Sequence, residues 1–190
     1  MNFRIVMSLL LITTLLSACG KQIKDEVNWP IKNFTAVNEN NQAFSLKNLK
    51  GKIWVSDFIF TSCADVCPAT TANMAKLQQK VKAGGLKNVE FVSFSVDPTV
   101  DSPSRLATYA KEFKAELKSW SFITGYSQKF IENFALKDFK TFVKKPDQGS
   151  QVVHSTYFYL VDTQGHIRKS YDGYQGVPYD EIIQDIKTLQ

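Results

Sequence analysis

The chain has 190 residues, of which 44% are hydrophobic and 22% are charged. This composition is typical of a globular protein and excludes a disordered tail, a collagen-like repeat and a multi-pass membrane protein. The formal net charge of +5 comes from basic residues scattered along the sequence. A chain of this length fits a single globular domain. Because no basic cluster with interleaved aromatic residues is present, we do not expect this domain to bind nucleic acid.

The first residues have the pattern of an export signal. Arg4 precedes an apolar stretch at 5–18, which is shorter than the ~20 residues that cross a bilayer as a helix. The stretch ends in Leu16-Ser17-Ala18-Cys19, which resembles the lipobox of bacterial lipoproteins. We therefore expect cleavage before Cys19 and a diacylglycerol group on its sulfur; an ordinary signal peptide or an uncleaved anchor is the alternative. The predicted segments are a signal peptide at 1–18, a lipidated cysteine with a polar tether at 19–28, and a folded domain at 29–190.

A lipid anchor of this kind would hold the domain on the extracytoplasmic face of the cell membrane. Besides Cys19, the chain has two cysteines, Cys63 and Cys67. Three cysteines are too few for a disulfide framework, and a domain of this size needs none. The pair at 63 and 67 therefore has to be explained by chemistry in an oxidising compartment.

The first half of the domain predicts a hairpin, a strand and a helix. Two short runs at 34–37 and 43–46 flank a polar stretch, which is the pattern of a β-hairpin. The mostly apolar run at 53–60 predicts a buried central strand. A helix is expected to follow from Pro68 and to end at Gly84-Gly85.

The second half predicts alternating strands and helices, then a hairpin and a last helix. Ser102 and Ser127 each precede an apolar pattern of helical period, so both are expected to be N-caps. This order argues for one α/β domain with a mixed central sheet. It is the order of a thioredoxin-like fold with an N-terminal β-hairpin extension. The expected strands are 89–96, 122–123, 156–161 and 166–171, and the last helix carries Ile182, Ile183, Ile186 and Leu189.

Cys63 and Cys67 lie in the loop between the predicted central strand and the helix. We expect Cys67 at the N-cap and Pro68 at the first helical position, where free N–H groups and the helix dipole would lower the pKa of the Cys67 thiol. With three residues between them, the two sulfurs can form a disulfide or bind one metal ion. A buried disulfide kept only for stability is the alternative, but closing so small a loop constrains the unfolded chain little.

The chain contains only two histidines. His166 follows a hairpin turn and is interpreted as a solvated strand residue. His154 ends a polar loop directly before a strand, close to the place where thioredoxin-like folds bring a loop to face the cysteines, so we expect it beside the two sulfurs. Two thiolates and an imidazole suit copper, because thiolates bind Cu(I) and the imidazole allows Cu(II) to be held as well. A closed zinc site would need a fourth protein ligand.

Three segments carry a family resemblance: residues 57–68 with the Cys-x-x-x-Cys-Pro block, Ser95-Val96-Asp97-Pro98 with Asp101 and Pro103, and Val153-His154-Ser155-Thr156. With them the chain resembles the Sco/SenC family, the copper chaperones of cytochrome c oxidase assembly, and its leader is most similar to Sco lipoproteins of Bacillus-type bacteria. The resemblance implies that Cys63, Cys67 and His154 bind one copper per domain, as Cu(I) or Cu(II). It also implies a reversible Cys63–Cys67 disulfide, and subunit II of cytochrome c oxidase, which has a dinuclear copper centre, as the partner.

Three functions are compatible with these residues. We favour a membrane-anchored metallochaperone that delivers copper to subunit II, maintains the thiols of its copper centre, or does both. The alternatives are an extracytoplasmic thiol–disulfide oxidoreductase that uses Cys63 and Cys67 and in which His154 is incidental, and a lipid-anchored binding module with a structural disulfide. We expect the chain to be a monomer. Asp97 is expected to form a turn or an N-cap, and a contact with the partner is the alternative role for this residue.

Overall fold

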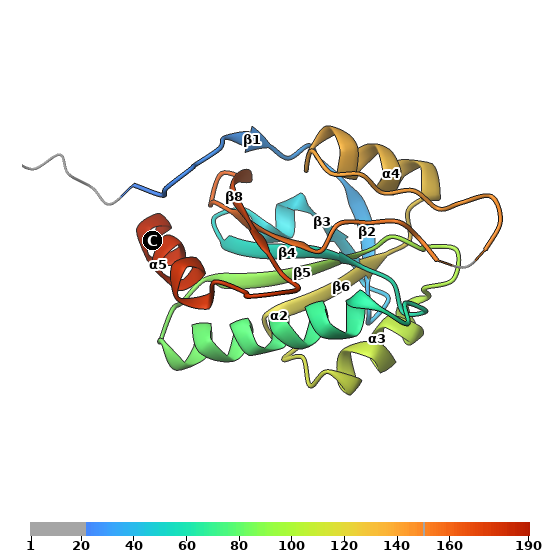
Figure 1. Ribbon diagram of the computed structural model, residues 1–190, viewed down its shortest axis with the longest axis horizontal. Coiled ribbons are helices and arrows are strands. Elements are labelled where there is room, and N and C mark those ends of the chain that lie inside the picture. The colour runs from blue at the N-terminus through green and yellow to red at the C-terminus, as the bar shows by residue number, and fades with distance from the viewer. Residues whose placement is uncertain (1–21, 150) are drawn as a thin grey trace, which may run out of the picture.

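An eight-stranded mixed sheet runs through the computed structural model, which describes residues 22–149 and 151–190 (Figure 1). The expected signal peptide and Cys19 lie outside these residues. The strand order is β1-β8-β7-β4-β5-β6-β2-β3. The strands are β1 (Trp29–Pro30), β2 (Thr35–Asn38), β3 (Ala43–Ser45), β4 (Ile53–Ile59), β5 (Val89–Ser95), β6 (Trp120–Thr124), β7 (Tyr157–Val161) and β8 (His166–Asp172).

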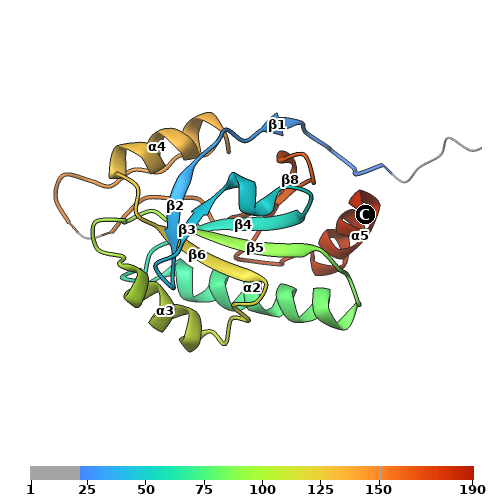
Figure 2. The same cartoon turned by 180° about the vertical axis from the view of Figure 1, so that it is seen from behind.

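The helices pack on both faces of this sheet (Figure 2). Their bounds are η1 (Leu46–Leu49, a 3-10 helix), α2 (Val66–Ala83), α3 (Pro103–Glu112), α4 (Gln128–Lys137) and α5 (Tyr179–Leu189). Apolar side chains of α2, α3 and α5 share one hydrophobic core with one face of the central strands, and those of α4 share a second core with the other face. The sheet is therefore the middle layer of a three-layer, thioredoxin-like α/β domain, as expected from the sequence.

The central strands pair in the way that their apolar character predicts. β4 is parallel to β5, and β5 is parallel to β6. β7 joins the other side of β4 in the antiparallel sense. All seven residues of β4 are buried, because helices cover both faces of this strand.

The N-terminal hairpin is confirmed and adds to the sheet at its edge. β2 pairs with β3 and also with β6. Two features at the N-terminal side of the hairpin were not predicted. Trp29 and Pro30 form the short strand β1 against β8, and the preceding residues, expected to be a tether, are packed: Ile23 is buried and the Val27 N–H donates to the Arg168 carbonyl.

The expected caps position α3 and α4. The Ser102 hydroxyl accepts the N–H of Arg105, and the Ser127 hydroxyl accepts the N–H of Phe130. α2 ends at Ala83 with Gly84 as its C-cap, as predicted, and Gly85 has a φ of +67°, a conformation that favours glycine after a helix. None of the helices among the described residues is long and apolar enough to cross a membrane.

We expect Phe94 to be a principal stabilising residue of the core beneath α4. Its ring is fully buried and lies 5.5–6.4 Å, between ring centroids, from the rings of Phe34, Trp54, Phe58, Phe134 and Phe139. Phe94→Ala should lower the free energy of unfolding by about 3–5 kcal/mol, measured by urea denaturation. Leu136→Ala is the control, because this exposed side chain should change stability by less than about 0.5 kcal/mol. Equal losses in the two variants would contradict the packing described.

Candidate metal centre

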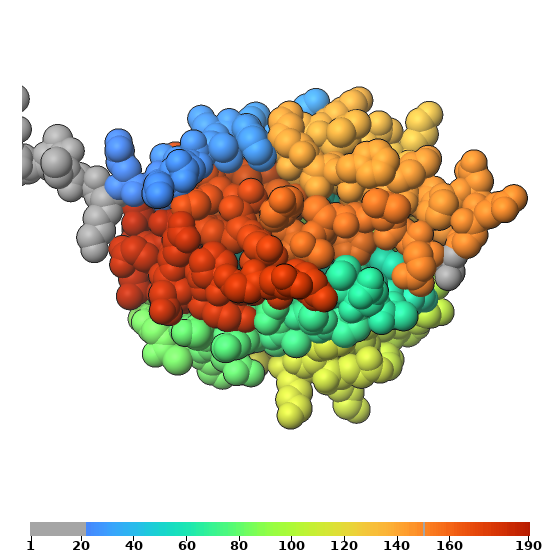
Figure 3. Space-filling model, viewed as in Figure 1, coloured from blue at the N-terminus to red at the C-terminus, as the bar shows by residue number. Residues whose placement is uncertain are grey.

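The candidate site forms where the C-terminal end of β4 meets the N-terminal end of β7. Cys63 lies in the loop that follows β4, and Cys67 lies in the first turn of α2. His154 precedes β7, whose antiparallel pairing with β4 brings the two ends together. Figure 3 shows the orange segment that leads to β7 lying against the teal segment that leads into α2.

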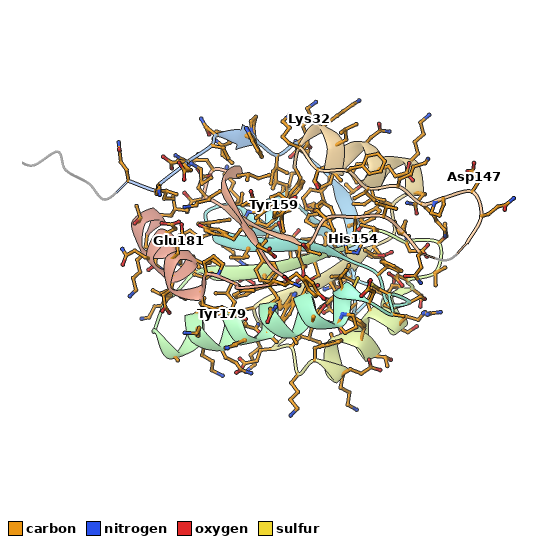
Figure 4. All side chains as sticks on the ribbon, in the orientation of Figure 1. Lys32, Asp147, His154, Tyr159, Tyr179 and Glu181 are labelled. Atoms are coloured by element: carbon orange, nitrogen blue, oxygen red, sulfur yellow. The ribbon has the colours of Figure 1, made fainter. Side chains whose placement is uncertain are left out.

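The structure brings the three predicted side chains into one cluster. The Sγ atoms of Cys63 and Cys67 and a ring nitrogen of His154 all lie within 4.8 Å of one another. Cys67 Sγ is 3.2 Å from His154 Nε2, and the Cys67 N–H donates to Cys63 Sγ over 3.4 Å. Figure 4 places His154 in the middle of the molecule, away from Asp147 at the outer tip of its loop. Both cysteines are free thiols, and among the described residues this is the only such group of potential metal ligands.

A backbone contact fixes which nitrogen of His154 faces the thiols. His154 Nδ1 lies 2.8 Å from the carbonyl oxygen of Ser155. A carbonyl can only accept, so Nδ1 carries a proton, and in the neutral form of the ring it is Nε2 that keeps a lone pair. Metal-binding histidines are commonly oriented by a hydrogen bond of this kind at the other ring nitrogen. The lone pair on Nε2 therefore points at Cys67 Sγ and is available to a metal.

The three ligands differ in their access to solvent. Cys67 is fully buried, whereas Cys63 and His154 are half-buried. The ring of Phe60, itself buried, contacts the His154 ring edge to face, with 5.6 Å between the ring centroids. An ion in this cluster would consequently be shielded on the Cys67 side and reached from the side of Cys63 and His154.

The predicted N-cap position of Cys67 is wrong. α2 begins at Val66 with Asp65 as its N-cap, so Cys67 and Pro68 are the second and third helical residues. Proline is tolerated there because the N–H groups of the first turn have no partner within the helix. The N–H of Cys67 is thereby free to donate to the sulfur of Cys63.

The order of acidity of the two thiols is also the reverse of the one expected. A hydrogen bond from the Cys67 side chain lowers the pKa of Cys63 to about 3, and partial burial opposes this effect. The hydrogen bond to Cys63 and burial raise the pKa of Cys67. Cys63 is thus the thiol that ionises first and the one that solvent reaches.

Two buried carboxyl groups lie close to this site. Asp57 of β4 has no hydrogen-bond partner for either carboxyl oxygen, and burial raises its pKa to about 7. Asp101 accepts the N–H and hydroxyl of Thr61 and the hydroxyl of Ser95, and so it fixes the backbone two residues before Cys63. Its own pKa is raised by burial.

The other candidate residues have different positions. His166 lies in β8 and does not belong to the cluster. Asp97 forms a turn, as expected, since its carbonyl accepts the N–H groups of Val100 and Asp101. Its carboxylate is buried and accepts from Lys145 Nζ at 2.6 Å. A partner contact through Asp97 stays a prediction; in this structure its carboxylate is engaged by Lys145.

The ion pair between Asp97 and Lys145 was not predicted. Lys145 lies in the polar segment before His154, and nothing in its neighbouring residues distinguishes it from Lys144. The two members of the pair are separated by 48 residues. Only the fold brings them together, so no local pattern could have indicated the contact.

The chain is similar to known proteins over most of its length. The model of the family described as SCO1/SenC matches residues 25–190. A SCO1 protein homolog of Bacillus subtilis is 47% identical over 94% of this chain and 92% of its own length. The crystal structure of a SCO1/SenC family lipoprotein from Bacillus anthracis is 44% identical, with a TM-score of 0.85 over 88% of this chain and 99% of that one.

Two further structures carry information about sulfur and copper. BsSco, whose structure is described as identifying a disulfide switch in a family of cytochrome c oxidase assembly proteins, is 46% identical with a TM-score of 0.82 over 89% of this chain and 98% of its own. Copper-bound ScoI of Arabidopsis thaliana is 26% identical with a TM-score of 0.69 over 83% of this chain and 96% of that one. By its sequence, its fold and the family model that covers most of its length, this chain belongs to the SCO1/SenC family.

Proposed function

We propose that this chain is a membrane-anchored copper-binding assembly factor for cytochrome c oxidase. Cys63, Cys67 and His154 bind one copper ion, which is the cargo of the protein. The chain delivers this copper to the dinuclear copper centre of subunit II, maintains the thiols of that centre, or does both. The observation that carries the proposal is the convergence of two sulfurs and one imidazole nitrogen within 4.8 Å.

The donor set favours copper over other metals. Two thiolates are sufficient for Cu(I), which is soft and accepts low coordination numbers, and the imidazole adds the harder ligand that Cu(II) prefers. A structural zinc site would need a fourth ligand, and the cluster of described residues supplies three. The orientation of Nε2 by the Ser155 carbonyl means that copper binding requires little rearrangement of the ring.

The proposed partner and location rest on the family. BsSco is described as a member of the Sco family of cytochrome c oxidase assembly proteins, and the Bacillus anthracis relative is described as a lipoprotein. The proposed lipid site is Cys19, which ends the apolar leader. A diacylglycerol group there would hold the domain on the outer face of the membrane, on the same side as the copper centre of subunit II.

Loss of His154 should weaken Cu(II) binding far more than Cu(I) binding. We expect the reduced domain to bind one equivalent of Cu(II) with an intense thiolate-to-copper absorption band. His154→Ala should lower the Cu(II) affinity at least about tenfold, or about 1.4 kcal/mol, because only the two sulfurs remain. The measurement is a titration followed by visible absorption and metal analysis.

The matched control for this titration is His166→Ala, which removes the other histidine of the chain. This variant should bind Cu(II) as the parent does. Cys63→Ser and Cys67→Ser should each abolish the thiolate-to-copper band of the parent. A Cu(II) affinity that is indifferent to His154 and to both cysteines would refute the proposed site.

A second candidate function, thiol–disulfide exchange, is favoured by the acidity and exposure of Cys63. The Cys63 thiolate would attack a partner's disulfide and form a mixed disulfide, which Cys67 would then resolve. The partner gains two thiols, and this chain is oxidised from a dithiol to the Cys63–Cys67 disulfide. This activity is compatible with the first proposal, since it would reduce the cysteines that receive the copper.

The pH dependence of alkylation tests this reading of the two thiols. An ordinary thiol loses reactivity about tenfold per pH unit below its pKa of about 8.5. The pKa of Cys63 is lowered to about 3, so one thiol of the metal-free, reduced chain should react with iodoacetamide at a nearly constant rate from pH 8 to pH 5. Peptide mapping should assign the modified thiol to Cys63. A rate that falls steadily below pH 8, or modification mainly at Cys67, would contradict the arrangement.

A further inference from the structure

His154 is presented by a two-stranded ribbon outside the main sheet. Lys144 and Val153 form an isolated antiparallel bridge, in which each N–H donates to the other's carbonyl over 2.9 Å. The bridge joins the segment after α4 to the segment before β7, and we call these two segments, residues 142–145 and 152–154, the ribbon. His154 is the residue directly after the bridge. The register of the ribbon decides which of its side chains face the core and which face solvent.

Side chains alternate strictly along both segments of this ribbon. Phe142 and Val153 point outward and are each 59% exposed, whereas Val143 and Val152 are 3% and 5% exposed and belong to the core beneath α4. His154 follows the outward-facing Val153 and therefore faces inward, toward Cys67. A slip of one residue would reverse every side chain and turn the imidazole away from the sulfurs.

Lys145 is the charged residue on the inner side of the ribbon. Its Nζ lies 2.6 Å from Asp97 Oδ1 and 2.7 Å from Thr99 Oγ1. The side chain of Asp97 is 3% exposed and that of Lys145 is 25% exposed. The pair therefore links the ribbon to the turn that directly follows β5, a central strand of the sheet.

The adjacent lysine makes a different contact. Lys144 Nζ lies 3.2 Å from Glu132 Oε2 on α4, and its side chain is 53% exposed. An exposed pair of this kind contributes little to stability. A partner buried as deeply as Asp97 is costly to leave unpaired. Removing one or the other of these neighbouring lysines therefore compares the loss of a buried ion pair with the loss of an exposed one on the same ribbon.

We infer that Lys145 is a positioning residue of the metal site. Its ion pair with Asp97 holds the register of the ribbon and keeps the His154 imidazole directed at Cys67. This inference rests on the proposed function, because it assigns a role in copper binding. Since Cu(I) is held by the two sulfurs and Cu(II) also uses the imidazole, the pair acts selectively on the affinity for Cu(II).

The test compares Lys145→Met with Lys144→Met in the reduced chain. We expect Lys145→Met to weaken Cu(II) binding about 10- to 100-fold, the range found when a residue that supports a metal ligand is removed. Cu(I) affinity, measured by competition with a chromophoric chelator, should change less than about threefold. Lys144→Met should bind both ions as the parent does, and Lys145→Arg, which keeps the charge, should recover part of the Cu(II) affinity.

A double variant separates positioning from a general loss of stability. Lys145→Met alone leaves the Asp97 carboxylate buried without its partner, whereas Asp97→Asn/Lys145→Met removes both charges. The double variant should fold and should still show the selective loss of Cu(II) affinity. An unchanged ratio of Cu(II) to Cu(I) affinity in the double variant, or an equal loss in Lys144→Met, would overturn the inference.

A measurement without copper distinguishes this inference from the proposed function. In the metal-free chain, the amide protons of Lys144 and Val153 should exchange at least about tenfold faster in the double variant than in Lys144→Met, as measured by NMR. Equal exchange rates would refute the positioning role. A parent chain that binds no copper would instead refute the proposed function, and the exchange rates would still show whether Lys145 holds the ribbon.

Discussion

The antiparallel pairing of β7 with β4 is the constraint on which the site depends. Ser56 lies opposite Tyr159 and Trp54 lies opposite Val161; continued in the same register, His154 falls opposite Thr61, two residues before Cys63. Because β4 is also the parallel partner of β5, its position is fixed by the most buried part of the sheet. The site is thus assembled from chain segments about 90 residues apart by the register of one strand pair.

Within this frame the two sulfurs have unequal surroundings. Cys67 is buried in the first turn of α2 and contacts His154, whereas Cys63 is half-buried and accepts the Cys67 N–H. One thiol can therefore hold a metal in a shielded position while the other is reached by a partner. The same asymmetry suits copper transfer and thiol exchange, which is why the two proposed activities share one set of residues.

Much of the fold could be predicted because local patterns determine it. The apolar runs predicted the central strands, and Ser102 and Ser127 predicted the starts of α3 and α4. The start of α2 was predicted too late because Pro68 fits both the first and the third helical position. The true N-cap, Asp65, makes no side-chain capping hydrogen bond, so the usual capping pattern did not indicate it. The packing of Ile23 and the Lys145–Asp97 pair depend on partners distant in sequence, so no local pattern indicates them.

The proposed function requires that two sulfurs and one imidazole share a single copper ion. The most direct test is X-ray absorption spectroscopy at the copper edge on the Cu(II)-loaded domain, with His154→Ala beside it. We expect two sulfur ligands and scattering from one imidazole in the parent. In the variant the sulfur shell should be retained while the imidazole signal is lost. A site with a single sulfur, or an imidazole signal that persists in His154→Ala, would refute the three-ligand copper site.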